Sequence, residues 1–356
     1  MAQIDKYFEL MVKEGASDLH MPAGATPYLR VHGELKKLNH PPLTHDQNKA
    51  LFTEIMSERY RNQFKEKMQA DFVYPLGNIA RFRSNVFMQR KGISAAFRMI
   101  PSQVLSAEQL NLPESMLKLC RLKKGMVLVT GPTGSGKSTT LAALIDYINQ
   151  NDKGHILTVE DPIEFVHQNK SCLVSQRQIG ENVESFTDAL RAALREDPDI
   201  ILVGEMRDLE TISLAITAAE TGHLVFGTLH TTSAAKTVDR IIDAFPMNQQ
   251  EQIRTILSES LKGVIAQALL RRADGKGRVA AYEILLGVPA LANLIRDNKS
   301  YQIPTLIQTQ KASGMQLMDQ ALLDLVKKRI VTPQHAMEFA VDKSTFAAAA
   351  GANRPQ

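Results

Sequence analysis

The chain has 356 residues, of which 44% are hydrophobic and 22% are charged, and these proportions are typical of globular proteins rather than of disordered ones. This length allows about two domains, each large enough to bury a core. Lysine and arginine number 42 against 38 aspartates and glutamates, and the net charge of +4 gives no support for a nucleic-acid-binding protein.

No run of about 18 apolar residues occurs, and the first ten residues are amphipathic. We therefore expect neither a membrane span nor a signal peptide, and a soluble, cytoplasmic protein. The two cysteines, Cys120 and Cys172, are too few for a four-cysteine zinc site and lie far apart in the sequence. We expect both to be buried thiols.

Residues 1–100 are expected to form a small α/β domain. Apolar residues between positions 4 and 12 follow helical spacing, whereas residues 28–31, 72–74 and 79–88 have patterns typical of strands. Residues 101–113 have a proline at each end and little periodicity, which predicts a linker between two domains.

Residues 114–342 are expected to form a larger α/β domain. Apolar runs of strand length at 126–130, 155–160, 199–205 and 224–230 are separated by helical patterns. Such alternation predicts a parallel sheet covered by helices on both faces.

The rest of the chain is expected to be mostly helical. Between residues 234 and 342 one strand-like run, 279–286, interrupts the helical pattern, and Thr332 with Pro333 predicts the start of a helix. Residues 343–356 are small and polar enough to predict a flexible tail.

The most specific motif in the chain is a phosphate-binding loop between a predicted strand and a predicted helix. Its backbone N–H groups and the start of the following helix would cradle the phosphates of a nucleotide. Lys137 would contact the β- and γ-phosphates, and Ser138 would bind Mg²⁺. The residues assigned to nucleotide binding are Gly131, Pro132, Thr133, Gly134, Ser135, Gly136, Lys137, Ser138 and Thr139.

Carboxylates follow two of the predicted parallel strands, whose carboxyl ends are where such sheets bind ligands. Glu205 would face the γ-phosphate and orient or deprotonate a water; capping of the next helix or pairing with Arg207 is the alternative. Glu160 and Glu164 belong to an acidic segment that ends the preceding predicted strand, and they are candidates for binding Mg²⁺, directly or through water, unless this segment is only a solvated turn.

His230 and two arginines are further candidates. His230 ends a predicted strand and should lie on the same edge as Glu205, although a local hydrogen bond is the simpler role of such a histidine. The histidines lack metal-ligand spacing, so zinc is disfavoured. Arg81 and Arg83 alternate with apolar residues, so both should share one strand face and could clamp phosphate oxygens; exposed arginines of this kind are otherwise merely solubilising.

Together these motifs resemble the secretion ATPases, and most closely the type IV pilus retraction ATPases, the PilT family. The resemblance rests on residues 194–208, on the VEDPIE segment at 159–164, on residues 219–231 and on GASDLH near the start. It implies a RecA-like P-loop ATPase core preceded by a smaller PAS-like α/β domain, assembled as a hexamer. It also implies a catalytic Glu205, an aspartate box with Glu160 and Glu164, a histidine box with His230, and contacts from Arg81 and Arg83 to nucleotide.

By the same resemblance the protein would hydrolyse ATP with Mg²⁺ and power pilus retraction and twitching motility. Its partners would be the inner-membrane platform protein of the pilus machine, at the cytoplasmic face of that membrane, and a second retraction ATPase. We expect no nucleic-acid partner and no direct membrane insertion.

One segment departs from the family pattern. Residues 290–297 read ALANLIRD, whereas the usual retraction motif is AIRNLIRE. An accessory retraction paralogue is therefore an alternative to the primary retraction enzyme. A DNA-directed RecA-like motor and a non-enzymatic nucleotide-gated ring are two further alternatives.

Overall fold

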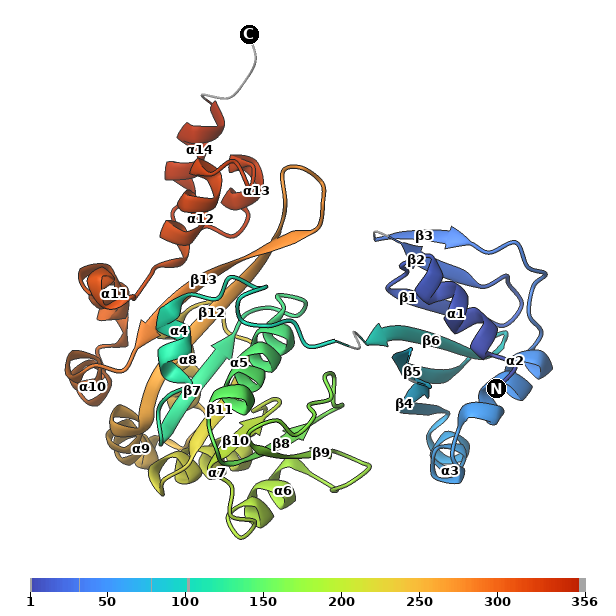
Figure 1. Cartoon of the computed structure of the whole chain (residues 1–356), viewed down its shortest axis with the longest axis horizontal. Coiled ribbons are helices and arrows are strands. Elements are labelled where there is room, and N and C mark those ends of the chain that lie inside the picture. Colours follow the sequence, from blue (N-terminus) through green and yellow to red (C-terminus); the bar gives the residue numbers. More distant parts are fainter. Residues whose placement is uncertain (1, 32, 78, 101–102, 352–356) are drawn as a thin grey trace. The chain divides into compact units, whose positions relative to one another are not determined.

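The computed structural model describes residues 2–31, 33–77, 79–100 and 103–351 (Figure 1). The chain divides into two compact units, Met1–Gln103 and Val104–Gln356. Both units combine helices with a sheet, which confirms the predicted α/β class. None of the helices in the described part of the chain has both the length and the apolar character that a membrane span requires.

The first unit is a six-stranded antiparallel sheet in the order β3-β2-β1-β6-β5-β4, accompanied by three helices. Its elements are α1 (Asp5–Lys13), β1 (Asp18–Met21), β2 (Tyr28–Val31), β3 (Glu34–Lys37), α2 (His45–Ile55), α3 (Glu58–Lys67), β4 (Gln69–Leu76), β5 (Ala80–Gln89) and β6 (Gly92–Ile100).

Aromatic packing holds this unit together. Phe8 of α1 stacks on Phe82 of β5 with ring centroids 4.2 Å apart and meets Phe97 of β6 edge-on at 5.0 Å. All three rings are buried. Aromatic rings of this size dominate the energy of a small core, so the helix predicted at the start of the chain is fixed on the sheet by Phe8.

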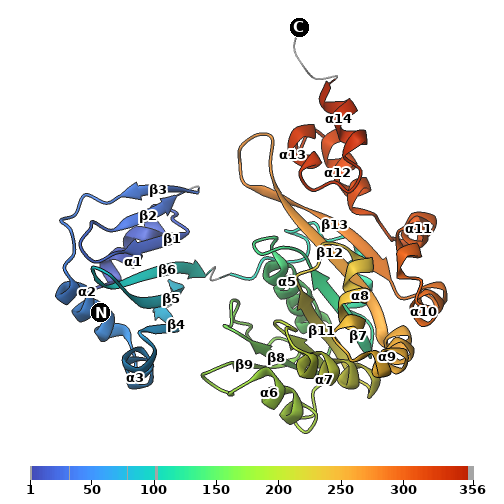
Figure 2. The same ribbon diagram turned by 180° about the vertical axis from the view of Figure 1, so that it is seen from behind.

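The second unit contains the remaining elements (Figure 2). They are α4 (Glu114–Leu119), β7 (Gly125–Thr130), α5 (Lys137–Asn151), β8 (His155–Glu160), β9 (Leu173–Gln178), α6 (Phe186–Ala193), β10 (Ile200–Val203), α7 (Leu209–Glu220), β11 (Leu224–Leu229), α8 (Ala234–Asp243), α9 (Met247–Ser260), β12 (Leu261–Arg271), β13 (Arg278–Leu286), α10 (Pro289–Arg296), η1 (Ser300–Gln302), α11 (Ile303–Thr309), η2 (Lys311–Ser313), α12 (Met318–Lys327), α13 (Pro333–Met337) and α14 (Lys343–Gly351).

Its seven-stranded sheet has the order β13-β12-β7-β11-β10-β8-β9. All neighbouring strands from β12 to β9 are parallel, and β13 pairs antiparallel with β12 at the edge. The predicted parallel sheet is therefore confirmed for the four strands expected in it. The strand-like run at 279–286 is confirmed as β13, whereas β9 and β12 are strands that the sequence did not predict.

Helices cover both faces of this sheet. Alternating residues of β7 point to opposite sides, so that Val127 and Val129 pack with α4 and α5 whereas Met126 and Leu128 pack with α6 to α11. A third cluster joins α12, α13 and α14 to the ends of β12 and β13. Burial on both faces explains why the central strands are apolar along their whole length.

The structure differs from the sequence-based expectation in three segments. Residues 104–113 of the predicted linker belong to the second unit, since Ala107 and Leu112 are buried in its core; residues 101 and 102 lie outside the described residues. Residues 234–342 also contain the long strand β12, which was expected to be helical. Residues 343–351 of the predicted flexible tail form helix α14, which the fully buried Phe346 packs against the rest of the unit. Residues 352–356 lie outside the described residues.

Two local predictions are confirmed. Thr332 is the N-cap of α13, where its hydroxyl accepts a hydrogen bond from the backbone N–H of His335 at 3.3 Å. Cys120 and Cys172 are free and buried. Burial raises the pKa of Cys120 to about 12, so this thiol stays protonated and unreactive.

Candidate active site

The phosphate-binding loop connects β7 to α5, as the motif requires. Gly131, Gly134 and Gly136 have φ values of +141°, +80° and +87°, which L-residues with side chains rarely adopt. At Gly131 a Cβ atom would also lie 2.3 Å from the backbone oxygen of Gln267, on the neighbouring strand β12. The loop path therefore depends on glycine for both conformation and space.

Lys137 is the first residue of α5 and bends back over the loop. Its ammonium donates to the backbone oxygens of Gly131 at 2.8 Å and Pro132 at 3.2 Å. Burial lowers the pKa of Lys137, while the charges of Glu205 and Glu164 oppose this shift. The lysine is thus held in the loop beside two of the carboxylates that the sequence selected.

The remaining loop residues differ in exposure. Ser135 is buried and its hydroxyl has no hydrogen-bond partner in the described part of the chain, whereas Pro132, Thr133, Gly134 and Ser138 are exposed and Gly136 and Thr139 are half-buried. An unpaired buried hydroxyl is costly unless a ligand completes its hydrogen bonding. This arrangement fits a loop that receives phosphate oxygens.

Glu205 follows β10 and lies between a histidine and an arginine. Oε1 of Glu205 lies 2.9 Å from Nε2 of His230, and Oε2 accepts a hydrogen bond from Arg207 at 2.6 Å. The bond from Arg207 holds the pKa of Glu205 below its usual range despite burial, and the bond to His230 adds to this effect. Glu205 is therefore an ionised carboxylate with directed lone pairs.

The helix that follows Glu205 is capped by a different carboxylate. The N-cap of α7 is Asp208, whose carboxylate accepts from the backbone N–H of Thr211 at 2.8 Å. Helix capping by Glu205 is therefore wrong. Pairing with Arg207 does occur, but through one carboxylate oxygen only.

Glu160, at the end of β8, is held inside the domain. Its Oε1 accepts hydrogen bonds from Thr158 at 2.7 Å and from Gln176 of β9 at 3.1 Å. Burial raises the pKa of Glu160 in spite of these bonds. Glu164 is half-buried and interacts electrostatically with Lys137, which places it nearer the loop.

These residues suit a magnesium ion that is bound mainly by nucleotide and water. The described residues contain no group of three His, Cys, Asp or Glu side chains that could hold a metal by themselves. Mg²⁺ commonly keeps several water ligands and takes one or two protein oxygens plus substrate phosphates. The exposed hydroxyl of Ser138 at the start of α5 is such an oxygen.

Arg81 and Arg83 lie in the first unit on strand β5. The residues Ala80, Phe82 and Ser84 alternate with them and are buried, so both arginines are on the opposite face of the strand. Arg83 is exposed and stands directly across from Arg98 of β6. Arg98 in turn donates to Asp18 of β1 at 2.8 Å.

Several residues of the site were missed by sequence reasoning. Gln267 of β12 is buried behind the loop, where its Oε1 accepts from Thr140 of α5 at 2.8 Å. Thr130 of β7 donates to the backbone oxygen of Thr231 at 2.6 Å. Only the pairing of strands brings these residues together, and β12 was not recognised as a strand.

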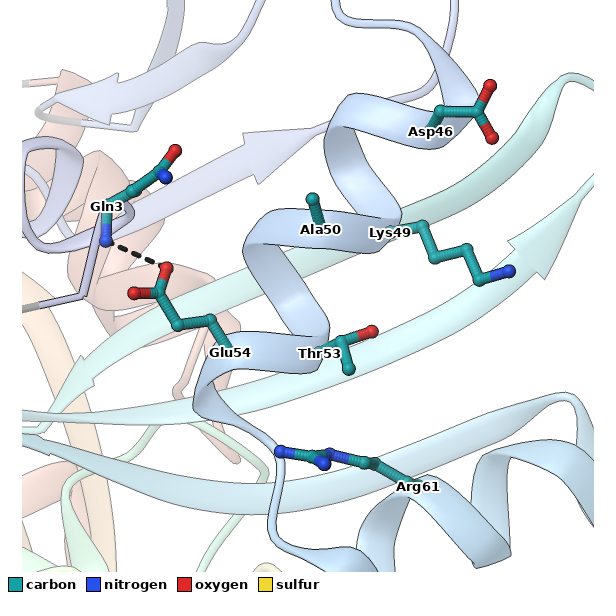
Figure 3. Close-up of a pocket in the computed structure, with 7 residues that line it drawn as sticks. All are labelled: Gln3, Asp46, Lys49, Ala50, Thr53, Glu54 and Arg61. Carbon is teal, nitrogen blue, oxygen red and sulfur yellow. Dashed lines mark hydrogen bonds between the residues drawn. The ribbon is translucent and has the colours of Figure 1, made fainter.

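A separate groove lies on the first unit and is lined mostly by polar and charged side chains (Figure 3). It has a volume of about 550 Å³ and is lined by Asp46, Lys49, Ala50, Thr53 and Glu54 of α2, by Arg61 of α3 and by Gln3, which precedes α1. The backbone N–H of Gln3 donates to Glu54 across it at 2.9 Å. None of the predicted site residues lines this groove, so the chemistry is assigned to the loop in the second unit.

Known proteins resemble this chain over nearly its whole length. The chain is 53% identical over 343 residues to the type IV pilus retraction ATPase PilT of Pseudomonas aeruginosa, covering 96% of this chain and 99% of that protein. It is 40% identical over 338 residues to the type IV pilus ATPase PilU of the same organism, covering 95% and 88%. The crystal structure of the pilus retraction motor PilT with bound ADP superposes with a TM-score of 0.89 at 48% identity, covering 97% of this chain and 98% of that one.

The model of the family described as Type II/IV secretion system protein matches residues 1–337. This match spans both units and includes the phosphate-binding loop, Glu205 and His230. The chain belongs to the Type II/IV secretion system protein family.

Proposed function

We propose that this protein is an ATP-hydrolysing motor that powers retraction of type IV pili. The observation that carries the proposal is the ionised Glu205, hydrogen-bonded to His230 at 2.9 Å and electrostatically coupled to Lys137 of the phosphate-binding loop. Identity of 53% to the type IV pilus retraction ATPase PilT, against 40% to the type IV pilus ATPase PilU, supports a role in retraction.

In the proposed reaction the loop binds the phosphates of ATP through its backbone N–H groups and Lys137. Glu205 accepts a hydrogen bond from the attacking water and orients it toward the γ-phosphate, because an ionised carboxylate is an acceptor only. His230 and Arg207 restrict the carboxylate to one orientation from two sides. Positioning of this kind is the main contribution that a protein makes to phosphoryl transfer.

Mg²⁺, when bound, would neutralise the phosphate charge that develops in the reaction. Ser138 would ligate it, and Glu164 or Glu160 would reach it through water. Of the two carboxylates Glu164 is the better candidate, since Glu160 already accepts bonds from Thr158 and Gln176.

Arg81 and Arg83 are proposed to supply positive charge to nucleotide phosphates during turnover. Their common face of β5 suits a two-pronged contact with phosphate oxygens. An arginine that interacts with phosphate in only one conformation makes ATP binding favour that conformation. Hydrolysis and phosphate release would then reverse the shift and deliver mechanical work.

The proposal extends to assembly and location. The protein would act as a homohexamer in the cytoplasm, docked on the inner-membrane platform protein of the pilus machine, with a second retraction ATPase as a further partner. The altered segment 290–297 lies on α10, with Leu291 and Ile295 buried and Arg296 exposed. Ala292 stands where the usual motif has its first arginine.

The decisive experiment measures phosphate release by the purified oligomer with ATP and Mg²⁺, with Glu205→Gln as the matched variant. We expect the wild type to turn over and the variant to bind ATP with turnover reduced about 10²- to 10⁴-fold, the range for removal of a positioned base. Equal turnover in both would contradict the assignment of Glu205. Absence of turnover in the wild type would support a nucleotide-gated scaffold, and salt-dependent DNA binding would support a DNA-directed motor.

Deletion of the gene tests the biological role. Cells that lack the motor should be hyperpiliated and unable to twitch, and the wild-type gene should restore both properties whereas the Glu205→Gln gene should not. Normal piliation and motility in the deletion strain would contradict a primary role in retraction.

A further inference from the structure

The position of His230 is not fixed by burial of its own side chain. That side chain is 49% exposed, and among the described residues its hydrogen-bond partner is Glu205. His230 directly follows β11 and precedes the short connection to α8. The geometry of the His230–Glu205 pair therefore depends on the backbone on both sides of His230, which is strand β11 before it and residues 231–237 after it.

One side of this segment is held by hydroxyl groups. Thr130, the last residue of β7, lies with its hydroxyl 2.7 Å from that of Thr231. The Thr231 hydroxyl is also 2.7 Å from that of Thr237 in α8. These contacts connect the segment to the strand that leads into the phosphate-binding loop.

The other side is held by a buried carboxylate on β13. Glu283 is 6% exposed, and its Oε1 accepts from the backbone N–H of Ala234, the first residue of α8, at 2.7 Å. Its Oε2 lies 3.4 Å from the backbone nitrogen of Met318, the first residue of α12. A carboxylate is stabilised at the positive ends of two helices, so one side chain joins the start of α8 to the start of α12.

Glu283 is itself held in register. Ile284 exchanges two backbone hydrogen bonds with Gln316, of 2.7 and 3.0 Å, and the side chain of Gln316 donates to the backbone oxygen of Tyr282 at 3.1 Å. Tyr282 lies on the opposite face of β13 and interacts with Thr140 of α5. Two adjacent residues of β13 thus contact two different helices. Tyr282 contacts α5, which follows the phosphate-binding loop, and Glu283 contacts α8, which follows the His230 segment.

We propose that Glu283 is a positioning residue that holds His230 against Glu205 and links this pair mechanically to α12. The inference rests on the proposed hydrolytic role of Glu205 and His230. Because Glu283 touches neither nucleotide-binding nor reacting groups, its loss should lower kcat while leaving the KM for ATP nearly unchanged. Small misplacements of a catalytic group can lower rates by as much as about 100-fold.

The informative variant is Glu283→Gln, which conserves shape. A glutamine has one acceptor oxygen and one NH₂ group. If its oxygen accepts from the backbone N–H of Ala234, its NH₂ group faces the backbone N–H of Met318, and if its oxygen accepts from Met318, its NH₂ group faces Ala234. Asp319→Asn is the matched control, since Asp319 is the second residue of α12 and its two carboxylate oxygens accept from the backbone N–H groups of Val341 and Asp342 rather than from α8. We expect kcat to fall about tenfold in Glu283→Gln and to stay within twofold in Asp319→Asn.

A cycle with His230→Ala separates positioning from general stability. If Glu283 acts through His230, the double variant has the same kcat as His230→Ala alone. Multiplication of the two losses, or a folded Glu283→Gln oligomer with wild-type kcat, would overturn the proposal. If Glu283→Gln does not fold, the same segment can be loosened from its other side at Thr237. Thr237→Ser keeps the hydroxyl that contacts Thr231 and should keep the wild-type kcat, whereas Thr237→Val removes it and should lower kcat.

Hydrogen exchange provides a readout that does not depend on turnover. Amides of residues 230–238 should exchange faster in Glu283→Gln than in the wild type or in Asp319→Asn, because local opening governs exchange. Unchanged protection there would overturn the positioning role even in an active enzyme. If residues 230–238 exchange faster in Glu283→Gln but the wild type hydrolyses no ATP, the positioning role of Glu283 stands and only the proposed function is contradicted.

Discussion

Nε2 of His230 lies 2.9 Å from Oε1 of Glu205, although 25 residues separate them in the sequence. Parallel pairing of β10 with β11 brings the two strand ends to one edge, and the backbone N–H of Met206, which follows Glu205, donates to the backbone oxygen of Thr228 at 3.1 Å. The pair is therefore a product of strand register.

Removal of Arg207 should change the pH dependence of hydrolysis. The Arg207 guanidinium holds the pKa of Glu205 below its usual range, so Glu205 stays ionised in mildly acidic solution. In Arg207→Gln this pKa should rise, and the acidic limb of kcat should move to higher pH, since the protonated acid no longer accepts a bond from water. Steady-state rates between about pH 4 and 8, a range that reaches below the ordinary carboxyl pKa, would measure the shift; coincident profiles would contradict it.

Gly131→Ala should destabilise the protein more than Gly134→Ala. Both positions have positive φ, which costs an alanine about 1–2 kcal/mol. Only at Gly131 would the new Cβ meet the backbone oxygen of Gln267, whereas at Gly134 it meets nothing within 4 Å. We expect the difference in free energy of unfolding, measured without nucleotide, to be about 1–3 kcal/mol. Equal destabilisation would contradict the close approach of β12 to the loop.

Arg83→Ala should impair hydrolysis more than ATP binding. The side chain is exposed, so its removal should change the melting temperature little. If it interacts with phosphate during turnover, kcat should fall by one or more orders of magnitude, because an arginine supplied to phosphoryl transfer is worth on the order of 10³–10⁵ in rate. Arg98→Ala, on the next strand, is the control for loss of charge, and an unchanged kcat in Arg83→Ala would exclude a role for it.

Asp18 should stabilise the first unit in a pH-dependent manner. Burial favours the neutral acid, but hydrogen bonds from Ser17 and Arg98 outweigh it and hold the pKa of Asp18 below its usual range. A lowered folded-state pKa gives stability that is fully present above the ordinary value of about 4 and is lost as the pH falls through the folded value. The wild type should therefore be more stable than Asp18→Asn at pH 7.

Chemical denaturation of both proteins at several pH values measures this effect. The difference in free energy of unfolding between wild type and Asp18→Asn should shrink as the pH falls from about 4, where the unfolded chain takes up the proton, through the lower pKa of Asp18 in the folded protein. Groups that titrate equally in both proteins cancel in the difference. A gap that stays constant down to pH 2 would show that the carboxylate charge does not contribute.

The sequence alone determined the chemistry-bearing residues and the order of the central elements. Its signals are local: the glycine and lysine spacing of the loop, apolar runs long enough for buried strands, and a carboxylate or histidine directly after such runs. Because parallel strands end at one edge, these signals also predicted that Glu205 and His230 would lie together.

Tertiary structure decided what depends on contacts between distant segments. Strand β12 has an apolar pattern that does not distinguish a strand from a buried helix, and only its pairing with β7 and β13 settles its conformation. Phe346 orders α14 because α12, α13 and β12 enclose it. The connection of Glu283 to two helix starts, 49 and 35 residues away, has no local signal, since hydrogen bonds to backbone N–H groups place no demand on the partner's side chain.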